Sequence, residues 1–390
     1  MISSRLPADL SPNAVTRAIA ARLAGGQPLI DLTETNPTRV GIPYPADLLA
    51  ALADPAALAY DPQPLGLMSA REAVAREYAR HGLAVEPHRV ALTSSTSEAY
   101  ALLFKLFCDP GDEVLVPQPS YPLFDLLTRL EAVTPVAYQL EYHGRWRIDI
   151  GSVARGLSPR TRALLVVSPN NPTGSFLHRQ DLADLIEVCQ RHDLPLIGDE
   201  VFFDYRLDST PERVSVLDQE QVVGCALGGL SKSCGLPQIK LGWITWTGPA
   251  APLASVLQAY EIVADSYLSV STPVQVAAPQ LLARAGTVRT QIQARIARNL
   301  QALREACAVW PAVSALTAEG GWSAVVQVPA TRSEEDLVLT LIAEDDVLVH
   351  PGFFFDFARE AFLVVSLIVE PDRFDVGVAR LLARACGSGR

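Results

Sequence analysis

Lysine is scarce in this chain of 390 residues. The 32 lysines and arginines comprise only three lysines, at positions 105, 232 and 240, and 29 arginines. A codon bias towards arginine and alanine is a sufficient cause. The consequence is nevertheless useful, because any reaction that needs a lysine amine has only three possible positions along the chain.

The sequence also lacks the features of a nucleic-acid-binding, membrane or secreted protein. The formal net charge is −11, so no basic surface indicates a polyanion as partner. Apolar runs such as residues 361–369 are less than about half as long as a transmembrane helix requires. Arg17 and Arg22 interrupt the alanine-rich N-terminal segment, so we expect no secretory signal and a cytoplasmic protein.

Cysteine and histidine do not occur in metal-binding patterns. The six cysteines lie far apart without a CxxC pair, and the six histidines show no HExxH spacing. We therefore expect buried thiols, with neither a disulfide framework nor a metal site. The cysteines are Cys108, Cys189, Cys225, Cys234, Cys307 and Cys386.

Between about residues 61 and 249, short apolar or β-branched runs alternate with helical patterns. This alternation is typical of an α/β protein with a mostly parallel, helix-covered sheet. The predicted strands are 90–93, 114–117, 163–167, 195–198, 222–227 and 242–246, and the predicted helices are 69–81, 97–107, 121–130 and 178–192. Ligands bind such sheets beyond the carboxyl ends of the strands, so residues just after strands are the site candidates.

The pattern changes near residue 272. A long helical stretch runs to residue 309, and strands at 324–328, 347–350 and 362–367 then alternate with helices at 334–344 and 373–385. The length agrees with two domains. We expect a large ligand-binding domain over residues 46–272, a small α+β domain over 273–390, and an N-terminal segment, 1–45, that packs with the small domain.

Lys232 lies in the segment Gly-Leu-Ser-Lys-Ser-Cys-Gly, between two predicted strands. Partial desolvation at the end of a strand disfavours an ammonium ion, so the amine can attack an aldehyde. Most lysines are solvated, however, and this short motif alone does not establish such a role. Lys105 falls in an amphipathic helix, where a surface position accounts for it.

Asp199 and Asn171 follow two other predicted strands. A carboxylate at Asp199 can keep a pyridine nitrogen protonated, which makes the ring an electron sink for a carbanion. Helix capping after a strand accounts for the same residue equally well. Asn171 belongs to the turn Ser-Pro-Asn-Asn-Pro-Thr-Gly. Its amide can donate to a phenolate oxygen, unless the segment is simply a tight turn.

Five consecutive hydroxyl residues, 93–97, separate a predicted strand from an apolar helix. A helix N-terminus presents free N–H groups and the positive end of the helix dipole, so hydroxyls at this point suit a phosphate. Ordinary N-capping explains one hydroxyl well and a cluster of five less well. The hydroxyl cluster 93–97 is therefore a candidate phosphate site.

The order of these four elements resembles that of the class I and II aminotransferases of fold type I, the aspartate aminotransferase-like family. The resemblance covers nearly the whole chain, and its specificity lies in the succession of motifs. It implies the cofactor pyridoxal 5'-phosphate and a homodimer with shared active sites. Further matching segments are Asn-Pro-Thr at 36–38, Tyr60, Gly66, Arg-Glu-Ala at 71–73, Pro-Gly-Asp-Glu-Val at 110–114, Pro-Ser-Tyr-Pro at 119–122 and Pro-Gly at 351–352.

The resemblance implies a role for each residue that matches a contact to the cofactor ring in this family. Lys232 would carry the cofactor as a Schiff base and move a proton between the substrate α-carbon and the cofactor. Asp199 would pair with the pyridinium, Asn171 would donate to the ring oxygen, and Tyr121 would stack on the ring. Tyr121 is also explained as a loop residue that fills the edge of the sheet.

The phosphate contacts follow in the same way. The resemblance assigns Ser95, Thr96 and Ser97 to the phosphate. It also implies that Tyr60 reaches the phosphate of the neighbouring subunit, although a surface loop position accounts for Tyr60 as well. Lys240 stands where such enzymes have an arginine, so it offers a point charge instead of a planar fork, unless it is a plain surface lysine.

Two further departures bear on the site. Phe202 replaces the tyrosine that usually contacts the cofactor three residues after the aspartate. Val364 replaces the arginine that pairs bidentately with the substrate carboxylate. Either another arginine serves, or the substrate has no carboxylate at this point. We take Arg39, in the loop that begins at Asn36, as the candidate substitute, with a solvated arginine as the alternative; Asn36 is a second candidate substrate contact.

The function that follows is transfer of an amino group between an amino acid and a 2-oxo acid by a ping-pong mechanism. The alternative keeps the cofactor but gives a lyase, racemase, decarboxylase or oxidase, because fold does not fix the reaction. A third reading is a ligand-sensing domain of a transcription regulator. It is disfavoured because the chain is acidic and begins close to the first motif.

Overall fold

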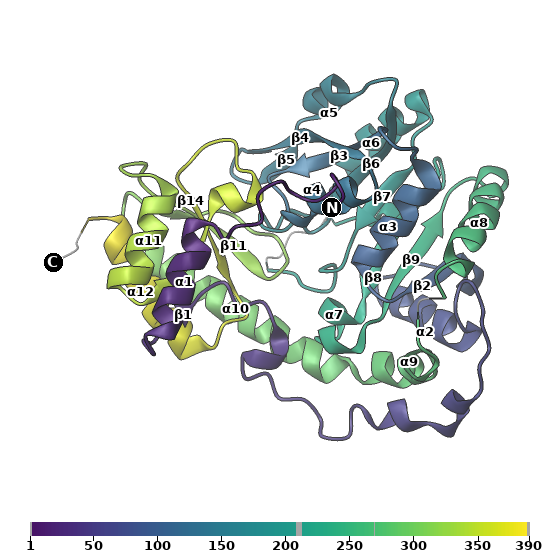
Figure 1. Ribbon diagram of the computed structural model, residues 1–390, viewed down its shortest axis with the longest axis horizontal. Helices are drawn as coiled ribbons and strands as arrows, with labels where there is room; N and C mark the ends of the chain where they lie inside the picture. The colour runs from purple at the N-terminus through teal and green to yellow at the C-terminus, as the bar shows by residue number, and fades with distance from the viewer. Residues whose placement is uncertain (1, 208–212, 269, 388–390) are drawn as a thin grey trace.

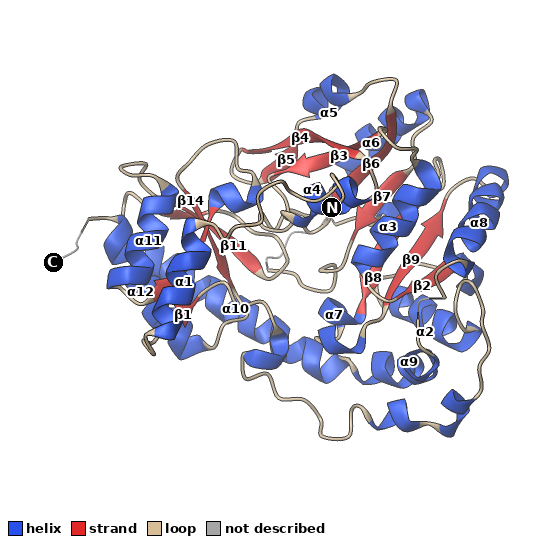
Figure 2. Cartoon of the chain, viewed as in Figure 1, coloured by secondary structure: helices blue, strands red, loops and turns tan. Residues whose placement is uncertain are grey.

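The computed structural model describes residues 2–207, 213–268 and 270–387, and two sheets organise these residues (Figure 1). An eight-stranded sheet forms the larger body and a four-stranded sheet forms the smaller one. Helices surround both sheets, as the colouring by secondary structure shows (Figure 2). Among the described residues, every helix is either too short or too polar to span a lipid bilayer.

The eight-stranded sheet has the order β2-β9-β8-β7-β6-β3-β4-β5. The five central strands β8, β7, β6, β3 and β4 run parallel, while β9 and β5 pair antiparallel with their neighbours. The strands are β2 (Val90–Thr93), β3 (Glu113–Gln118), β4 (Thr134–Tyr142), β5 (Trp146–Ile148), β6 (Thr161–Val167), β7 (Leu196–Asp199), β8 (Gly224–Gly229) and β9 (Gly242–Thr247).

Helices cover both faces of this sheet because its central strands are apolar on both sides. In β6, Leu165 and Val167 face a core that includes α3 (Thr96–Phe107) and α8 (Ala250–Asp265). Leu164 and Val166 face the opposite core, with α5 (Ile150–Gly156) and α6 (Arg179–His192). Successive side chains of a strand point to opposite faces, so a continuous apolar run indicates a strand buried on both faces.

The smaller body surrounds an antiparallel sheet of order β10-β11-β14-β13. Its core also contains residues of the N-terminal helix, and β1 pairs in parallel with β12 through Ile30 opposite Val347. The elements, which we call the small-sheet region, are α1 (Ala14–Ala24), β1 (Ile30–Asp31), α10 (Gly286–Ala308), β10 (Ser314–Ala315), β11 (Ser323–Gln327), α11 (Glu334–Glu344), β12 (Val347–Leu348), β13 (His350–Pro351), β14 (Phe362–Ser366) and α12 (Pro371–Ala385).

The remaining elements pack against the large sheet or follow its strands. Helices α2 (Met68–Ala79) and α9 (Thr272–Arg284) pack together with β2 and β9 in a further apolar core. Helix α4 (Leu123–Leu130) and the short helix α7 (Leu230–Ser233) follow β3 and β8 respectively. The architecture confirms the predicted α/β class with a mostly parallel sheet and a second, smaller sheet. The predicted helix from 272 to 309 is in fact two helices, with Ala285 between them.

Candidate active site

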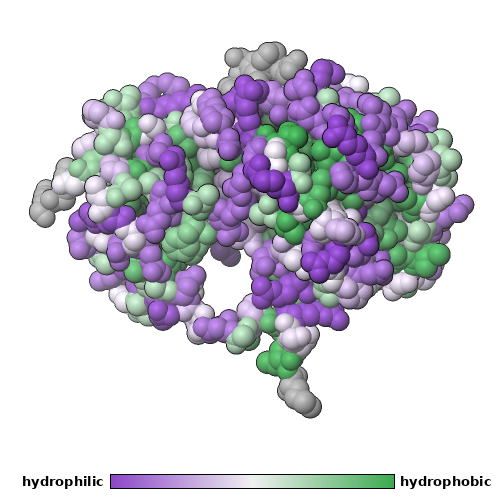
Figure 3. All heavy atoms as spheres, turned by 90° about the horizontal axis from the view of Figure 1, so that it is seen from above, coloured by the Kyte–Doolittle hydropathy of each residue, from purple (hydrophilic) through white to green (hydrophobic). Residues whose placement is uncertain are grey.

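A cavity of about 570 Å³ lies between the carboxyl ends of β6, β7 and β8 and the small-sheet region. Val167, Asp199 and Gly229 each end one of these strands and each line the cavity. The opposite wall includes Ser323 and Val364 of the small sheet. The space-filling view shows an opening between the two bodies (Figure 3). Parallel sheets bind ligands at this edge, so the position agrees with a substrate site.

Nine of the twelve predicted site residues line this cavity. They are Ser95, Thr96, Ser97, Tyr121, Asn171, Asp199, Phe202, Lys232 and Lys240. The other three do not line it. Tyr60 is 74% exposed and borders a different depression, together with Leu268. Asn36 accepts hydrogen bonds from the backbone N–H and the hydroxyl of Thr38, and Arg39 lies exposed at the end of this turn.

Lys232 extends from α7, directly after β8, into the cavity. Its Nζ atom lies 5.3 Å from the ring centroid of Phe202 and 5.0 Å from that of Trp322. Burial lowers the pKa of the amine to about 8, although the charge of Asp199 opposes this shift. Desolvation therefore makes the neutral, nucleophilic form of the amine accessible near physiological pH.

Asp199 is held at the end of β7 by two donors. The Tyr100 hydroxyl donates to Oδ2 at 2.8 Å, and the Val201 N–H donates to Oδ1 at 3.3 Å. Burial raises the pKa of Asp199, and these two hydrogen bonds oppose the rise because they favour the charged form. A half-buried, hydrogen-bonded carboxylate of this kind is suited to a cationic ring N–H.

The N-terminus of α3 forms the next part of the wall. Ser95 caps the helix by accepting from the Glu98 N–H at 3.1 Å, and Glu98 accepts from the Ser94 N–H at 2.6 Å. Capping thus uses one hydroxyl, while Thr96 and Ser97 line the cavity. Gly242 of β9 lies against this turn, since a Cβ there would come within 3.1 Å of the Thr96 nitrogen. The free N–H groups and hydroxyls suit a phosphate.

Asn171 is oriented from the small-sheet region. The Ser323 hydroxyl donates to Asn171 Oδ1 at 3.3 Å, which leaves the amide hydrogens free to point elsewhere. The turn that carries Asn171 is itself tied to the segment before β11, because Gly174 O accepts from the N–H groups of Glu319 and Gly320 at 3.0 and 2.8 Å. A Cβ on Gly174 would lie 2.7 Å from Gly320 O, so this close approach requires glycine.

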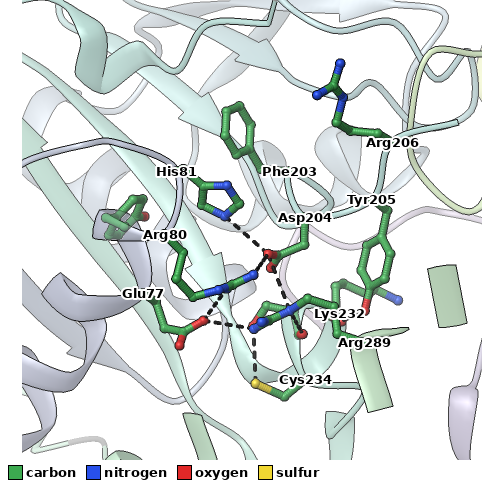
Figure 4. A network of polar contacts seen from close by, with 12 residues as sticks. Glu77, Arg80, His81, Phe203, Asp204, Tyr205, Arg206, Lys232, Cys234 and Arg289 are labelled. Carbon is green, nitrogen blue, oxygen red and sulfur yellow. Dashed lines mark hydrogen bonds and ion pairs between the residues drawn. The ribbon is translucent and has the colours of Figure 1, made fainter. Parts of the chain in front are cut away.

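A polar network supports the segment that carries Lys232 (Figure 4). Asp204 forms ion pairs with Arg80 at 3.1 Å, His81 at 3.2 Å and Arg289 at 3.4 Å. The Arg289 Nε atom donates to the backbone oxygen of Ser233 at 2.9 Å. The hydrogen bond from His81 and the charges of Arg289 and Arg80 lower the pKa of Asp204 against the effect of its burial.

Tyr205 completes the support, because its hydroxyl donates to the backbone oxygen of Lys232 at 2.7 Å. Sequence reasoning missed Tyr205, Asp204, Tyr100 and Trp322. The only signal was the unusual density of charged and aromatic residues directly after Asp199. Partners from distant parts of the chain, such as Arg289, carry no local signal.

The donor set fits pyridoxal 5'-phosphate. Lys232 offers an amine for the aldehyde, Asp199 a carboxylate for the pyridine nitrogen, and the start of α3 donors for the phosphate. The described ranges, which omit residues 1, 208–212, 269 and 388–390, contain no cluster of three or more histidine, cysteine or acidic side chains that could hold a metal ion.

Comparisons with known proteins agree with this chemistry. The sequence profile of the family described as aminotransferase class I and II matches residues 28–381. The chain is 29% identical to the alanine aminotransferase of Mycobacterium bovis over 351 residues, which are 85% of this chain and 80% of that protein. It is 24% identical to the glutamate-pyruvate aminotransferase of Escherichia coli K12 over 352 residues, 88% of this chain and 87% of that protein.

Solved structures agree on the fold. A crystal structure of an aminotransferase from Escherichia coli superposes with a TM-score of 0.88 at 22% identity, covering 99% of this chain and 98% of that one. The alanine aminotransferase of Pyrococcus furiosus gives a TM-score of 0.87 at 23% identity, covering 97% and 98%. The family profile, which covers most of the chain, confirms the resemblance inferred from the order of motifs. The chain belongs to the class I and II aminotransferase family.

Proposed function

We propose that this protein transfers an amino group between an amino acid and a 2-oxo acid, with pyridoxal 5'-phosphate bound at Lys232. The observation that carries the proposal is the convergence of three groups on one cavity. These are the desolvated amine of Lys232, the half-buried carboxylate of Asp199 and the capped N-terminus of α3. When bound, the cofactor supplies a cationic ring that accepts the electrons of the substrate Cα–H bond.

Each protein group has a separate task in this proposal. Lys232 binds the cofactor covalently, and its released amine accepts the α-proton and returns it. Asp199 keeps a proton on the ring nitrogen, because a carboxylate favours the cationic form of its partner. Tyr121 and Phe202, which both line the cavity, cover the apolar parts of the ring. The Asn171 amide donates to the ring oxygen.

Within one subunit, the proposed contacts to the cofactor phosphate all come from segments next to strands of the large sheet. Ser95, Thr96 and Ser97 provide hydroxyls and backbone N–H groups, and Lys240 provides the positive charge on the same side of the cavity. Since Lys240 is a point charge, its contact is less directional than that of an arginine fork. The backbone and hydroxyl donors at the start of α3 therefore carry most of the phosphate recognition.

Transamination is favoured over other reactions of the same cofactor. The relatives of Mycobacterium bovis and Escherichia coli are both named aminotransferases and align over most of this chain. The test is a half-reaction. In the absence of an oxo acid, an amino donor should convert the bound cofactor stoichiometrically to its amine form, and a 2-oxo acid should restore the original absorbance. A lyase, racemase, decarboxylase or oxidase would not show this full cycle.

We further propose a homodimer in which Tyr60 of each subunit completes the phosphate site of the other. Tyr60 is exposed and lies outside the cavity of its own chain. It borders a depression with Leu268, and Leu58 nearby in sequence is 91% exposed. Exposed apolar residues of this kind favour a protein partner.

The proposed domain division is a large cofactor-binding domain, 46–272, and a small domain, 273–390, with residues 1–45 packing against the small domain. The pairing of β1 with β12 supports the placement of the N-terminal segment. A cytoplasmic location is also proposed, because all six cysteines are free thiols, which suits a reducing compartment.

A further inference from the structure

The cavity wall formed by the small sheet contains a histidine with no role in the chemistry described above. An amino acid or 2-oxo acid brings a carboxylate, which requires a hydrogen-bond donor or a cation. No arginine of the described chain lines the cavity; its basic lining residues are Lys232, Lys240 and His350. Lys232 is assigned to the cofactor and Lys240 to the phosphate. His350 is therefore the remaining basic group.

The register of the small sheet places His350 directly beside Val364. The two residues are paired across β13 and β14, which run antiparallel. Residues that lie opposite each other in an antiparallel pair project from the same face of the sheet. Both side chains line the cavity accordingly. His350 thus occupies the same patch of wall as the apolar Val364, which cannot itself bind a carboxylate.

The His350 ring is held by its neighbours, but its polar atoms remain available. The ring centroid lies 5.9 Å from that of Phe354 and 5.6 Å from that of Phe355, with the Phe355 contact edge-on. Neither ring nitrogen forms a hydrogen bond within the part of the chain that the structure describes. Asp31 is the carboxylate whose charge favours the protonated ring, whereas burial lowers the pKa of His350.

We infer that His350 donates a hydrogen bond to the carboxylate of the substrate. This inference rests on the proposed function and names the residue that recognises its substrate. Either protonation state of the imidazole can act, because the neutral ring keeps one N–H and the cation has two. The imidazole would form one directional hydrogen bond with the carboxylate, whereas a guanidinium forms two parallel ones.

The test uses the cofactor-loaded protein and propionate, which has a carboxylate but no amino group and cannot react. Its dissociation constant is measured by calorimetry for the wild type, His350→Leu and His350→Gln. We expect His350→Leu to weaken propionate binding by about tenfold or more, because a hydrogen bond to a charged group is lost. His350→Gln, which keeps a donor, should lose about threefold or less. The matched control His143→Leu changes a histidine that is exposed near β5 and should bind propionate like the wild type.

A comparison of donors separates recognition from folding. Alanine and ethylamine differ only in the carboxylate, so His350→Leu should raise the alanine concentration needed for half-maximal conversion of the cofactor and leave that for ethylamine unchanged. If His350→Leu does not fold, crystals of the wild-type protein soaked with propionate decide the matter. They should show a carboxylate oxygen within 3.2 Å of a His350 nitrogen, about the limit of a normal hydrogen bond.

The inference is overturned if His350→Leu binds propionate within twofold of the wild type, if it impairs alanine and ethylamine equally, or if the soaked propionate lies away from His350. These outcomes differ from a failure of the proposed function. In that case the wild-type protein itself would not be converted by any amino donor. The inference on His350 would then fail as well. The half-reaction of the wild-type protein would show that the proposed function, and not the choice of His350, is wrong.

Discussion

The hydroxyl of Tyr100 in α3 donates a 2.8 Å hydrogen bond to Oδ2 of Asp199 at the end of β7. Tyr100 is buried and Asp199 is half-buried, and burial raises the pKa of Tyr100 well above its ordinary value, so the phenol stays protonated as a donor. The bond therefore favours the charged form of Asp199, the form needed beside a cationic ring. It also links α3, whose first turn holds the candidate phosphate ligands, to the strand that carries the carboxylate.

Removal of this donor should weaken the cofactor site. In Tyr100→Phe the pKa of Asp199 rises further, because one of the two bonds that oppose its burial is lost. We expect the dissociation constant for pyridoxal 5'-phosphate to increase about tenfold, in line with roughly 1.5 kcal/mol for a hydrogen bond to a charged group. An absorbance titration of the apoprotein measures it.

Tyr138→Phe is the matched control for this change. Tyr138 is also buried in the large sheet, and its hydroxyl donates to Leu165 O at 2.8 Å, away from Asp199. Both variants should lose about 1 kcal/mol of stability, but only Tyr100→Phe should lose cofactor affinity. Equal cofactor affinities in the two variants would contradict a specific role of Tyr100.

The pKa of Lys232, about 8, predicts the pH dependence of cofactor addition. Only the neutral amine attacks an aldehyde, so the second-order rate of covalent attachment should rise about tenfold per pH unit up to pH 7 and level off above about pH 8.5. Stopped-flow absorbance on the apoprotein gives this profile. A rate that keeps rising to pH 10 would mean that the amine titrates like a solvated lysine.

Asp204 should stabilise the fold through its ion pairs with Arg80, His81 and Arg289. Asp204→Asn removes the carboxylate that pairs with Arg289, whose side chain is only 11% exposed, and with the more exposed Arg80, so we expect a loss of about 2–4 kcal/mol at pH 7. Because the folded-state pKa of Asp204 is lowered, its contribution is complete above the unfolded-state value and is lost as pH falls through the folded-state pKa. Urea unfolding at pH 7 and below pH 4 measures this effect. The difference in the free energy of unfolding between wild type and variant should be smaller below pH 4 than at pH 7.

Asp125→Asn provides the control for Asp204. Asp125 pairs with Arg129 on the surface, with both side chains largely exposed, and such pairs contribute about 0–1 kcal/mol. The free energy of unfolding of Asp125→Asn should match that of the wild type at both pH values. A small, pH-independent effect of Asp204→Asn would show that the network in Figure 4 does not hold the Lys232 segment.

The exposed apolar residues near Tyr60 should mediate dimerisation. Light scattering should give twice the chain mass of 42.0 kDa for the wild type. Leu58→Glu places a charge on a side chain that is 91% exposed and should shift the mass towards one chain. Leu23→Glu, at another exposed position on α1, should stay a dimer. A monomeric wild type at micromolar concentration would refute the shared site.

The central strands could be predicted because they are buried on both faces. Residues 163–167 form an apolar run without interruption, and such a run has a clear signature. Strand β4 was missed because it is partly exposed and contains polar residues and a proline. The break at Ala285 was missed, although Gly286 directly after it disfavours the interior of a helix. The antiparallel direction of β9 depends on pairing with β2 and β8, which local patterns do not encode.

The site could be predicted where its residues follow strands. Asp199, Asn171 and Lys232 each do, and the topology of a parallel sheet brings strand ends together. The long-range partners could not be found. Trp322, which faces the Lys232 amine, and Ser323, which orients Asn171, come from the other body of the molecule. Arg39 seemed available from sequence proximity to Asn36, but the structure places it on the surface, outside the cavity.

Covalent capture of the cofactor tests the central claim most directly. The wild-type protein, loaded with pyridoxal 5'-phosphate and reduced with borohydride, should carry one reduced cofactor per chain, and mass spectrometry of its peptides should locate that group on Lys232. Lys232→Ala should capture none and show no amino transfer. A reduced cofactor on Lys105 or Lys240, or full turnover by Lys232→Ala, would contradict the account.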